Sequence, residues 1–344
     1  MTYKQTKIWI VDKNEQNLTE HKSIKEAALW VKNGRLVAFP TETVYGLGAN
    51  ALDDEAVKSI FAAKGRPSDN PLIVHAADKK QVSVLVTGIP ETAEKLMEAF
   101  WPGPVTIIFQ SNGSVSPLVT AGLPTVAIRI PDHPVALAFL KEAGVPVAAP
   151  SANRSQKPSP TKAEHVYQDL AGKIDGILDG GITGVGVEST VIDCTAEVPA
   201  ILRPGGVTKE QIEEVIGKVN IDPSLRNDQL APKSPGQKYV HYAPDAPLIL
   251  VSPEQDVISV IAKHKKNGAK IGVLTTDEHL YKWTEADVVI SLGERKNLYT
   301  VAQNLYDCLR QFDQTDVDII LAETFPEEGI GQAIMNRLKK AAKC

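Results

Sequence analysis

The sequence predicts an α/β fold built from two domains, and three observations support this. Strand-type and helix-type segments alternate along most of the chain, which is the pattern of sheets covered by helices. The chain has 344 residues, and a usual domain size of about 150 residues favours two domains over one. A proline-rich stretch over residues 219–246 interrupts the alternation and predicts a linker. We therefore expect a first domain over 1–218 and a second over 247–344.

The first domain is predicted from short apolar runs for strands and from apolar residues at helical spacing for helices. The predicted strands cover residues 36–39, 72–74, 105–109, 125–130, 145–149 and 190–193. The predicted helices cover residues 24–31, 56–64, 91–100, 135–142 and 161–170. Gly34 and Gly65 follow the first two helices and are expected to end them, because glycine adopts the left-handed conformation common at helix ends.

The second domain is predicted to be a small Rossmann-like βαβ unit. Its expected strands cover residues 248–251, 271–274, 288–292 and 319–322. Its expected helices cover residues 257–265, 299–311 and a closing segment from 332. Neither a dinucleotide-binding glycine turn nor a P-loop motif occurs, and Gly184-Val185-Gly186 is expected to be a turn before a strand. The sequence therefore predicts neither a Rossmann oxidoreductase nor a P-loop enzyme.

Composition excludes several other classes. The sequence has no apolar run of about 18 residues, and its first 20 residues lack a signal-peptide profile, so we expect a cytoplasmic protein with no membrane segment. The formal net charge of −5 gives no bulk attraction to nucleic acid. Cys194, Cys308 and Cys344 lie far apart and lack metal-ligand spacing, which predicts neither a disulfide framework nor a metal site.

Two segments place polar or cationic residues directly after a predicted element. The run from Pro40 to Gly48 follows a buried strand, and its Thr41 hydroxyl and backbone N–H groups can bind a small polar ligand. The alternative is a tight turn whose hydroxyls cap its own backbone. Lys64 ends a predicted helix and Arg66 follows it, and two cations at this position suit phosphate or carboxylate groups. The alternative is that Lys64-Gly65 is an ordinary helix ending.

Five more segments contain residues of these types. In residues 125–130, Arg129 shares a strand face with the small residues Thr125 and Ala127, which leaves room for a ligand unless the face is simply solvated. A strand of small residues leads into Ser151 and Asn153, where a flat group such as adenine can approach the backbone. Candidate residues elsewhere are Ser189, Arg203 beside a glycine turn, and His241 in the linker. Cations, hydroxyls and glycines thus recur at strand ends without a nucleophile–base pair.

These segments together resemble the YrdC/Sua5 family of threonylcarbamoyl-AMP synthases, in order and in register from residue 36 to 244. The motifs are PTETVYGLG, KGRP, DNPLIVH, WPGPVT, TVAIRIP, PSAN, GVEST, LRPG and HYAP. The resemblance implies a YrdC-like, strongly twisted mixed sheet with helices and a positively charged concave face. The second domain matches the Sua5 extension by its position and its βαβ pattern.

The resemblance also implies an activity. L-threonine, bicarbonate and ATP would give L-threonylcarbamoyladenylate and pyrophosphate, with Mg²⁺ carried on the ATP phosphates. A separate tRNA threonylcarbamoyl transferase complex would then use this product to modify tRNA position 37. Because the carbamate oxygen attacks ATP directly, this reaction needs no enzyme nucleophile.

Residue roles follow from the same resemblance, with Lys64 and Arg66 as the catalytic pair. The ATP-binding set is Lys64, Ser68, Ser151, Asn153, Ser159, Arg203 and His241. The L-threonine-binding set is Thr41, Arg66, His75, Thr125, Arg129 and Ser189. His75 is also a candidate proton acceptor by residue type. We further hypothesise that His241 and Tyr242 cover the site as a lid.

Two other functions stay open at this point. A basic concave face can also hold duplex RNA or tRNA, which would make the chain an RNA-binding module, and weak RNA binding can accompany the enzyme activity. A carbamoyl transferase acting on another acceptor would keep the same kind of domain but change the chemistry.

Overall fold

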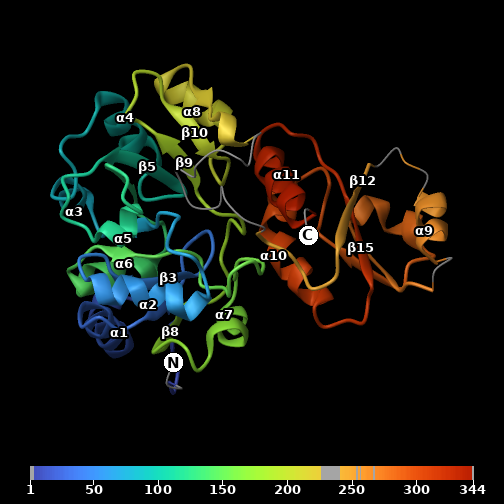
Figure 1. Cartoon of the computed structure of the whole chain (residues 1–344), viewed down its shortest axis with the longest axis horizontal. Helices are drawn as coiled ribbons and strands as arrows, with labels where there is room; N and C mark the ends of the chain where they lie inside the picture. Colours follow the sequence, from blue (N-terminus) through green and yellow to red (C-terminus); the bar gives the residue numbers. More distant parts are fainter. Residues whose placement is uncertain (1–3, 226–240, 253–254, 256, 266–267, 343–344) are drawn as a thin grey trace. The chain divides into compact units, whose positions relative to one another are not determined.

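The structure is a computed structural model that describes residues 4–225, 241–252, 255, 257–265 and 268–342 (Figure 1). The chain forms two compact units, which we call unit 1 and unit 2. Unit 1 comprises Met1–Ser155, Pro160–Gly184 and Glu188–Lys238. Unit 2 comprises Gln156–Ser159, Val185–Val187 and Tyr239–Cys344. Most of the predicted linker, residues 226–240, lies outside the described residues.

Unit 1 is built on an 11-stranded mixed sheet in the order β1-β8-β2-β3-β7-β4-β6-β5-β9-β10-β11. The strands are β1 (Lys7–Ile10), β2 (Val37–Phe39), β3 (Gly46–Asn50), β4 (Ile73–His75), β5 (Val105–Gln110), β6 (Thr125–Arg129), β7 (Val147–Ala148), β8 (Gly176–Asp179), β9 (Thr190–Asp193), β10 (Ala200–Arg203) and β11 (Asn220–Ile221). Parallel and antiparallel pairs both occur, so the expected mixed sheet is confirmed.

Helices cover both faces of this sheet. They are α1 (Lys22–Lys32), α2 (Asp54–Lys64), α3 (Lys79–Ser83), α4 (Glu91–Phe100), α5 (Pro117–Thr120), α6 (Pro134–Ala143), α7 (Ala163–Leu170) and α8 (Lys209–Ile216), with 3-10 turns η1 (Leu18–Glu20) and η2 (Pro223–Leu225). One apolar core lies against α2, α4, α7 and α8. A second core lies on the other face, where α1 packs against α6.

A third, smaller cluster of apolar side chains continues the face that α1 and α6 cover. All five of its buried members come from strands: Ile73, Ile108, Ala127, Val191 and Leu202. Their neighbours along each strand, such as Val74 and Ile128, point into the first core instead. Because side chains alternate across a sheet, this cluster forms a separate floor on the opposite face.

The predicted strands and helices of unit 1 are all present, but one predicted loop is a strand. Residues 46–50 form β3 and pair with β2 and β7. A Cβ atom on Gly48 would lie 2.9 Å from Cγ1 of Val147 and 3.0 Å from Cε1 of Phe39. The glycines therefore allow close packing of a strand, where the sequence indicated only loop flexibility.

Unit 2 contains a four-stranded, fully parallel sheet in the order β12-β15-β13-β14. Its elements are β12 (Leu248–Val251), α9 (Val257–Lys265), β13 (Ile271–Thr275), η3 (Asp277–Trp283), β14 (Val288–Ser291), α10 (Leu298–Phe312), β15 (Ile319–Glu323) and α11 (Ile330–Ala341). The predicted Rossmann-like pattern is confirmed. Among the described residues, no helix combines the length and apolarity that crossing a membrane requires.

Candidate active site

The candidate site of unit 1 lies across the small floor that the strands form around Ala127. Thr125 and Arg129 occupy opposite ends of β6 and share its floor-side face with Ala127. Four residues of extended chain separate them by about 13 Å. The sequence predicted that the candidate residues lie at strand ends. The structure adds that they lie at both ends of the strands, on either side of the floor around Ala127.

Arg129 is held in place by three different partners. Its side chain is 4% exposed, and its Nη2 lies 2.6 Å from Oε2 of Glu42. Its Nη1 donates to Oγ1 of Thr43 at 2.9 Å, and its Nε donates to the Gly103 carbonyl at 3.3 Å. The Thr43 hydroxyl also lies 2.8 Å from Oγ1 of Thr41. Thr41 and Arg129, both predicted to bind threonine, thus belong to one polar cluster.

His75 lies beside Arg129 because the two residues are register partners of the parallel strands β4 and β6. Its ring is buried, and Nδ1 has no hydrogen-bond partner among the described residues. Burial and the nearby Arg129 charge lower the pKa of His75 from 6.5 to about 3. His75 is therefore neutral at pH 7, and its role as a proton acceptor stays a prediction.

Lys64 contacts two other predicted ATP-binding residues, Ser151 and Asn153. The residue is buried at the end of α2, and Nζ donates to the carbonyls of Ser151 and Asn153, both at 2.5 Å. The Ser151 hydroxyl donates to Oδ1 of Asn153 at 2.5 Å. Gly65 takes the left-handed conformation with φ of 62°, which ends the helix as predicted. Lys64, Ser151 and Asn153 thus form a second polar cluster.

Arg66 and Ser68 follow directly in the loop after α2. Arg66 is half-buried and donates to the Asn70 carbonyl at 3.2 Å and to the Pro71 carbonyl at 3.4 Å. The Asn70 side chain is buried, and its amide has no hydrogen-bond partner among the described residues. Ser68 is exposed. Arg66 is thus anchored to the loop that leads into β4.

Ser189 and Arg203 form a third cluster at β9 and β10. Arg203 donates from Nη2 to Oγ of Ser189 at 3.1 Å and to its carbonyl at 2.9 Å. The Ser189 hydroxyl also lies 2.7 Å from Oγ1 of Thr106 on β5. Because β5 separates β9 from β6, this cluster lies two strands from Arg129.

Two predicted ATP-binding residues belong to unit 2. Ser159 is fully buried, and His241 is half-buried. Tyr242 is buried, with its ring centroid 5.3 Å from that of Tyr306 on α10. Tyr242 is therefore part of the packing of unit 2, and the lid hypothesis stays a prediction.

The structure adds three residues that the sequence did not single out. Glu42 and Thr43 hold Arg129, and Thr106 contacts Ser189. A signal for Glu42 did exist, because a buried arginine needs a counter-charge and Glu42 lies in the same loop as Thr41. Thr106 is the last residue of the WPGPVT motif, but its place within an apolar strand did not indicate a contact with Ser189.

Comparison with known proteins identifies the family of the chain. Residues 30–205 match a family model described as telomere recombination, Sua5_yciO_yrdC. Residues 207–343 match the model of the threonylcarbamoyl-AMP synthase C-terminal domain. The chain is 56% identical to the threonylcarbamoyl-AMP synthase of Bacillus subtilis, with 98% of each chain covered. The chain belongs to the Sua5/YrdC family.

Solved structures support the same assignment for both units. The crystal structure of Pyrococcus abyssi Sua5 complexed with L-threonine matches with a TM-score of 0.92 and 48% identity, covering 98% of each chain. Escherichia coli YciO, at 24% identity, covers 58% of this chain with a TM-score of 0.53, which shows the fold alone. This Sua5-family chain therefore has the two-domain architecture that the motifs indicated.

Proposed function

We propose that this chain is an enzyme that makes L-threonylcarbamoyladenylate from L-threonine, bicarbonate and ATP, which makes it a nucleotidyltransferase. The threonine amine and bicarbonate condense to a carbamate and release water. A carbamate oxygen then attacks the α-phosphorus of ATP. The bond between the α-phosphorus and the oxygen that bridges to the β-phosphate breaks, and pyrophosphate leaves with that oxygen. No covalent enzyme intermediate is required.

The observation that carries this proposal is a set of buried polar atoms around Arg129 and Arg66. Oε1 of Glu42, Nδ1 of His75 and the side-chain amide of Asn70 lack hydrogen-bond partners among the described residues, whereas Oε2 of Glu42 is paired with Arg129. Buried polar atoms without partners are costly, so such a set favours a ligand that supplies both donors and acceptors. An amino acid supplies both.

We assign the threonine and carbamate groups to the floor between Thr125 and Arg129, at the two ends of β6. A carboxylate suits a cationic site lined by hydroxyls, and the neutral His75 ring can still exchange hydrogen bonds there. The residues assigned to this group are Thr41, Arg66, His75, Thr125, Arg129 and Ser189.

We assign ATP to the cluster around Lys64 and keep the other ATP residues that the family resemblance implies. Lys64 and Arg66 are the proposed catalytic residues, because two fixed cations can stabilise charge that develops on the transferred phosphoryl group. Holding the carbamate and ATP in line supplies the rest of the rate acceleration through orientation. The residues assigned to ATP are Lys64, Ser68, Ser151, Asn153, Ser159, Arg203 and His241.

Mg²⁺ is proposed to enter as part of the substrate, bound to the phosphates of ATP. The described residues contain no group of three His, Cys, Asp or Glu side chains that could hold a metal ion. Magnesium usually keeps several waters and binds through substrate phosphates, so this chain need only accept the Mg–ATP complex. The product would pass to a separate tRNA-modifying transferase.

The proposal is tested by mass spectrometry of the product with each substrate omitted in turn. Threonylcarbamoyl-AMP should form only when L-threonine, bicarbonate and ATP are all present. A product of the same mass without bicarbonate would contradict the carbamate step.

Substitution of Lys64 tests its assigned role, and substitution of Lys58 on the same helix, α2, is the matched control. Lys64→Met should abolish product formation, whereas Lys58→Met should leave it unchanged. Lys58 lies on the same helix but is exposed and forms an ion pair with Glu55 at 3.5 Å. Circular dichroism would confirm that both variants fold, and full activity of a folded Lys64→Met variant would refute the assigned role.

A further inference from the structure

The parallel sheet of unit 2 has a topological switch point between its neighbouring strands β13 and β15. After β13 the chain enters η3, whose Trp283 packs in one core with Ile261 of α9. After β15 the chain enters α11, which packs against α10. Phe312 of α10 lies over Gly272 of β13, on the sheet face opposite to Val273 and the α9 core. The chain thus leaves these two strands towards opposite faces, and such points are where open α/β sheets bind ligands.

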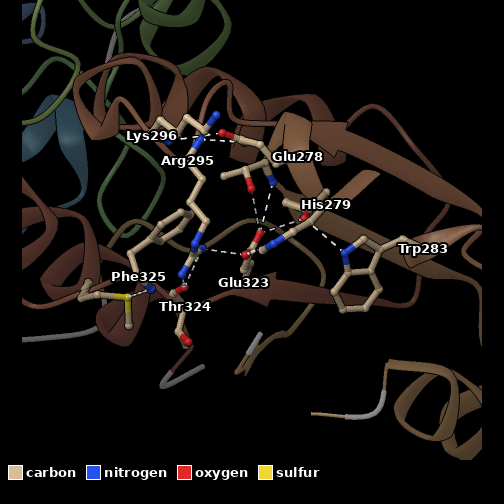
Figure 2. Close-up of polar contacts among 11 residues, drawn as sticks. Glu278, His279, Trp283, Arg295, Lys296, Glu323, Thr324 and Phe325 are labelled. Carbon is tan, nitrogen blue, oxygen red and sulfur yellow. Dashed lines mark hydrogen bonds and ion pairs between the residues drawn. The ribbon is translucent and has the colours of Figure 1, made fainter. Parts of the chain in front are cut away.

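A buried carboxylate lies at this switch point. Glu323 ends β15 and has a side chain only 2% exposed. Its Oε2 accepts from Oγ1 of Thr275 at 2.9 Å and from the backbone N and Oγ1 of Thr276, both at 3.2 Å. Its Oε1 accepts from Nη1 of Arg295 at 2.6 Å and contacts Nδ1 of His279 (Figure 2). Both carboxylate oxygens of Glu323 are engaged with protein groups, so its role is to fix the positions of those groups, including His279 and Arg295.

The two basic partners of Glu323 reach the surface. His279 retains 18% of its side-chain exposure and Arg295 retains 25%. His279 uses Nδ1 for Glu323, which leaves Nε2 without a partner among the described residues. Arg295 also donates to the Thr324 carbonyl and lies over the Phe325 ring, at 5.2 Å from its centroid (Figure 2). Its Nε–H and one Nη2–H stay available.

The loop that carries Arg295 is fixed in turn. The Glu278 carboxylate accepts from the backbone N of Arg295 at 2.8 Å and from that of Lys296 at 3.3 Å (Figure 2). The carboxylate of Asp277 accepts from the Ser291 hydroxyl. Two neighbouring acidic side chains are thus engaged with the loops, and Nε2 of His279 and the remaining N–H groups of Arg295 are left for a ligand.

We propose that His279 and Arg295 form a phosphate-binding site at the carboxyl edge of the unit 2 sheet, with Glu323 as the residue that positions both. Arg295 offers N–H donors, and Nε2 of His279 donates when the ring is protonated or accepts from a protonated phosphate oxygen when the ring is neutral, so the two side chains together suit a hydrogen phosphate group. A phosphate has enough oxygens to bridge the imidazole and the guanidinium, as such groups commonly do. The ligand is inorganic phosphate or the phosphate group of a nucleoside monophosphate.

This inference does not depend on the proposed function, and its test reads His279 directly. Two-dimensional ¹H–¹⁵N spectra of the histidine rings in the full chain would be recorded during titration with inorganic phosphate and, separately, with AMP. His279→Asn assigns the signal. A saturable shift of the His279 resonances is expected with at least one probe. Equal apparent affinities would identify inorganic phosphate as the sufficient ligand, and tighter binding of AMP would identify a nucleotide.

Matched variants separate a built site from general charge attraction. Arg295→Met should weaken the His279 response about 10-fold or more, as expected for the loss of a charged hydrogen bond. Lys296→Met removes an adjacent exposed charge and should change the response less than about twofold by the same reasoning. No saturable shift in the wild-type chain, or equal effects of the two variants, would overturn the proposal. Glu323→Gln, if folded, should broaden or move the His279 signal before any ligand is added.

Discussion

Replacing Glu42 with glutamine is expected to destabilise unit 1, because it removes the counter-charge of a buried guanidinium. The Glu42 and Arg129 side chains are 12% and 4% exposed, and their charged atoms lie 2.6 Å apart. Glutamine preserves the size of the side chain but leaves Arg129 with hydrogen bonds to neutral groups only. Breaking a buried ion pair by removing one partner costs about 3–5 kcal/mol of unfolding free energy. We expect a loss in that range.

A double-variant cycle separates the charge effect from packing. Arg129→Met in the Glu42→Gln background removes the stranded charge, and replacing both members of a buried pair is often neutral. The double variant should therefore recover most of the lost stability while losing threonine-dependent activity. Glu55→Gln is the control, because its exposed pair with Lys58 at 3.5 Å is worth less than about 1 kcal/mol.

Urea unfolding followed by tryptophan fluorescence measures these changes. Unit 1 contains Trp9, Trp30 and Trp101, so its transition contributes most of the signal, and the transition of unit 2 is fitted separately. A Glu42→Gln loss below about 1 kcal/mol, or a double variant less stable than both single variants, would refute the argument from the buried charge.

Three further outcomes test other parts of the structure. Burial lowers the pKa of His133 to about 4, so the unfolded state binds more protons between pH 6.5 and 4, and stability should fall by about 3 kcal/mol as pH falls through that window. His133→Asn should flatten this loss, and a parallel pH profile of unfolding midpoints would contradict it. Gly48→Ala should lower the urea midpoint by the equivalent of about 1–3 kcal/mol, whereas Gly88→Ala, with open space around its Cβ position, should not; equal midpoints would count against tight packing at β3. Burial raises the pKa of Cys194 to about 12, so iodoacetamide at pH 8 should label it by mass spectrometry only after unfolding, and labelling of the native protein at the unfolded rate would show the thiol to be accessible.

Local chemistry explains why much of the fold could be predicted. The alternation of Val126 and Ile128 with Ala127 and Arg129 assigned opposite faces of β6, and the structure confirms that division. In the same way, Gly65 marked the end of α2. These features depend on backbone geometry and side-chain periodicity over a few residues, so a sequence carries them directly.

Contacts between distant segments explain what could not be predicted. Gly46 and Gly48 indicate a loop by their own preferences, and they form a strand because β3 pairs with β2 and β7. Phe39 beside both glycines and Val147 beside Gly48 leave little room for larger side chains. Thr106 reaches Ser189 across paired strands that are far apart in sequence. Such pairings depend on the register of the whole sheet.

The sequence by itself determined the family, the alternation of helices and strands, and the residue types of the candidate site, because each is written in contiguous motifs or in local periodicity. Tertiary structure decided the environment of those residues. It placed Glu42 against Arg129, buried His75 until its pKa fell to about 3, and joined His279, Arg295 and Glu323 at one edge of a sheet. Charge, burial and hydrogen bonding depend on neighbours in space, and for these residues many of those neighbours are distant in the chain.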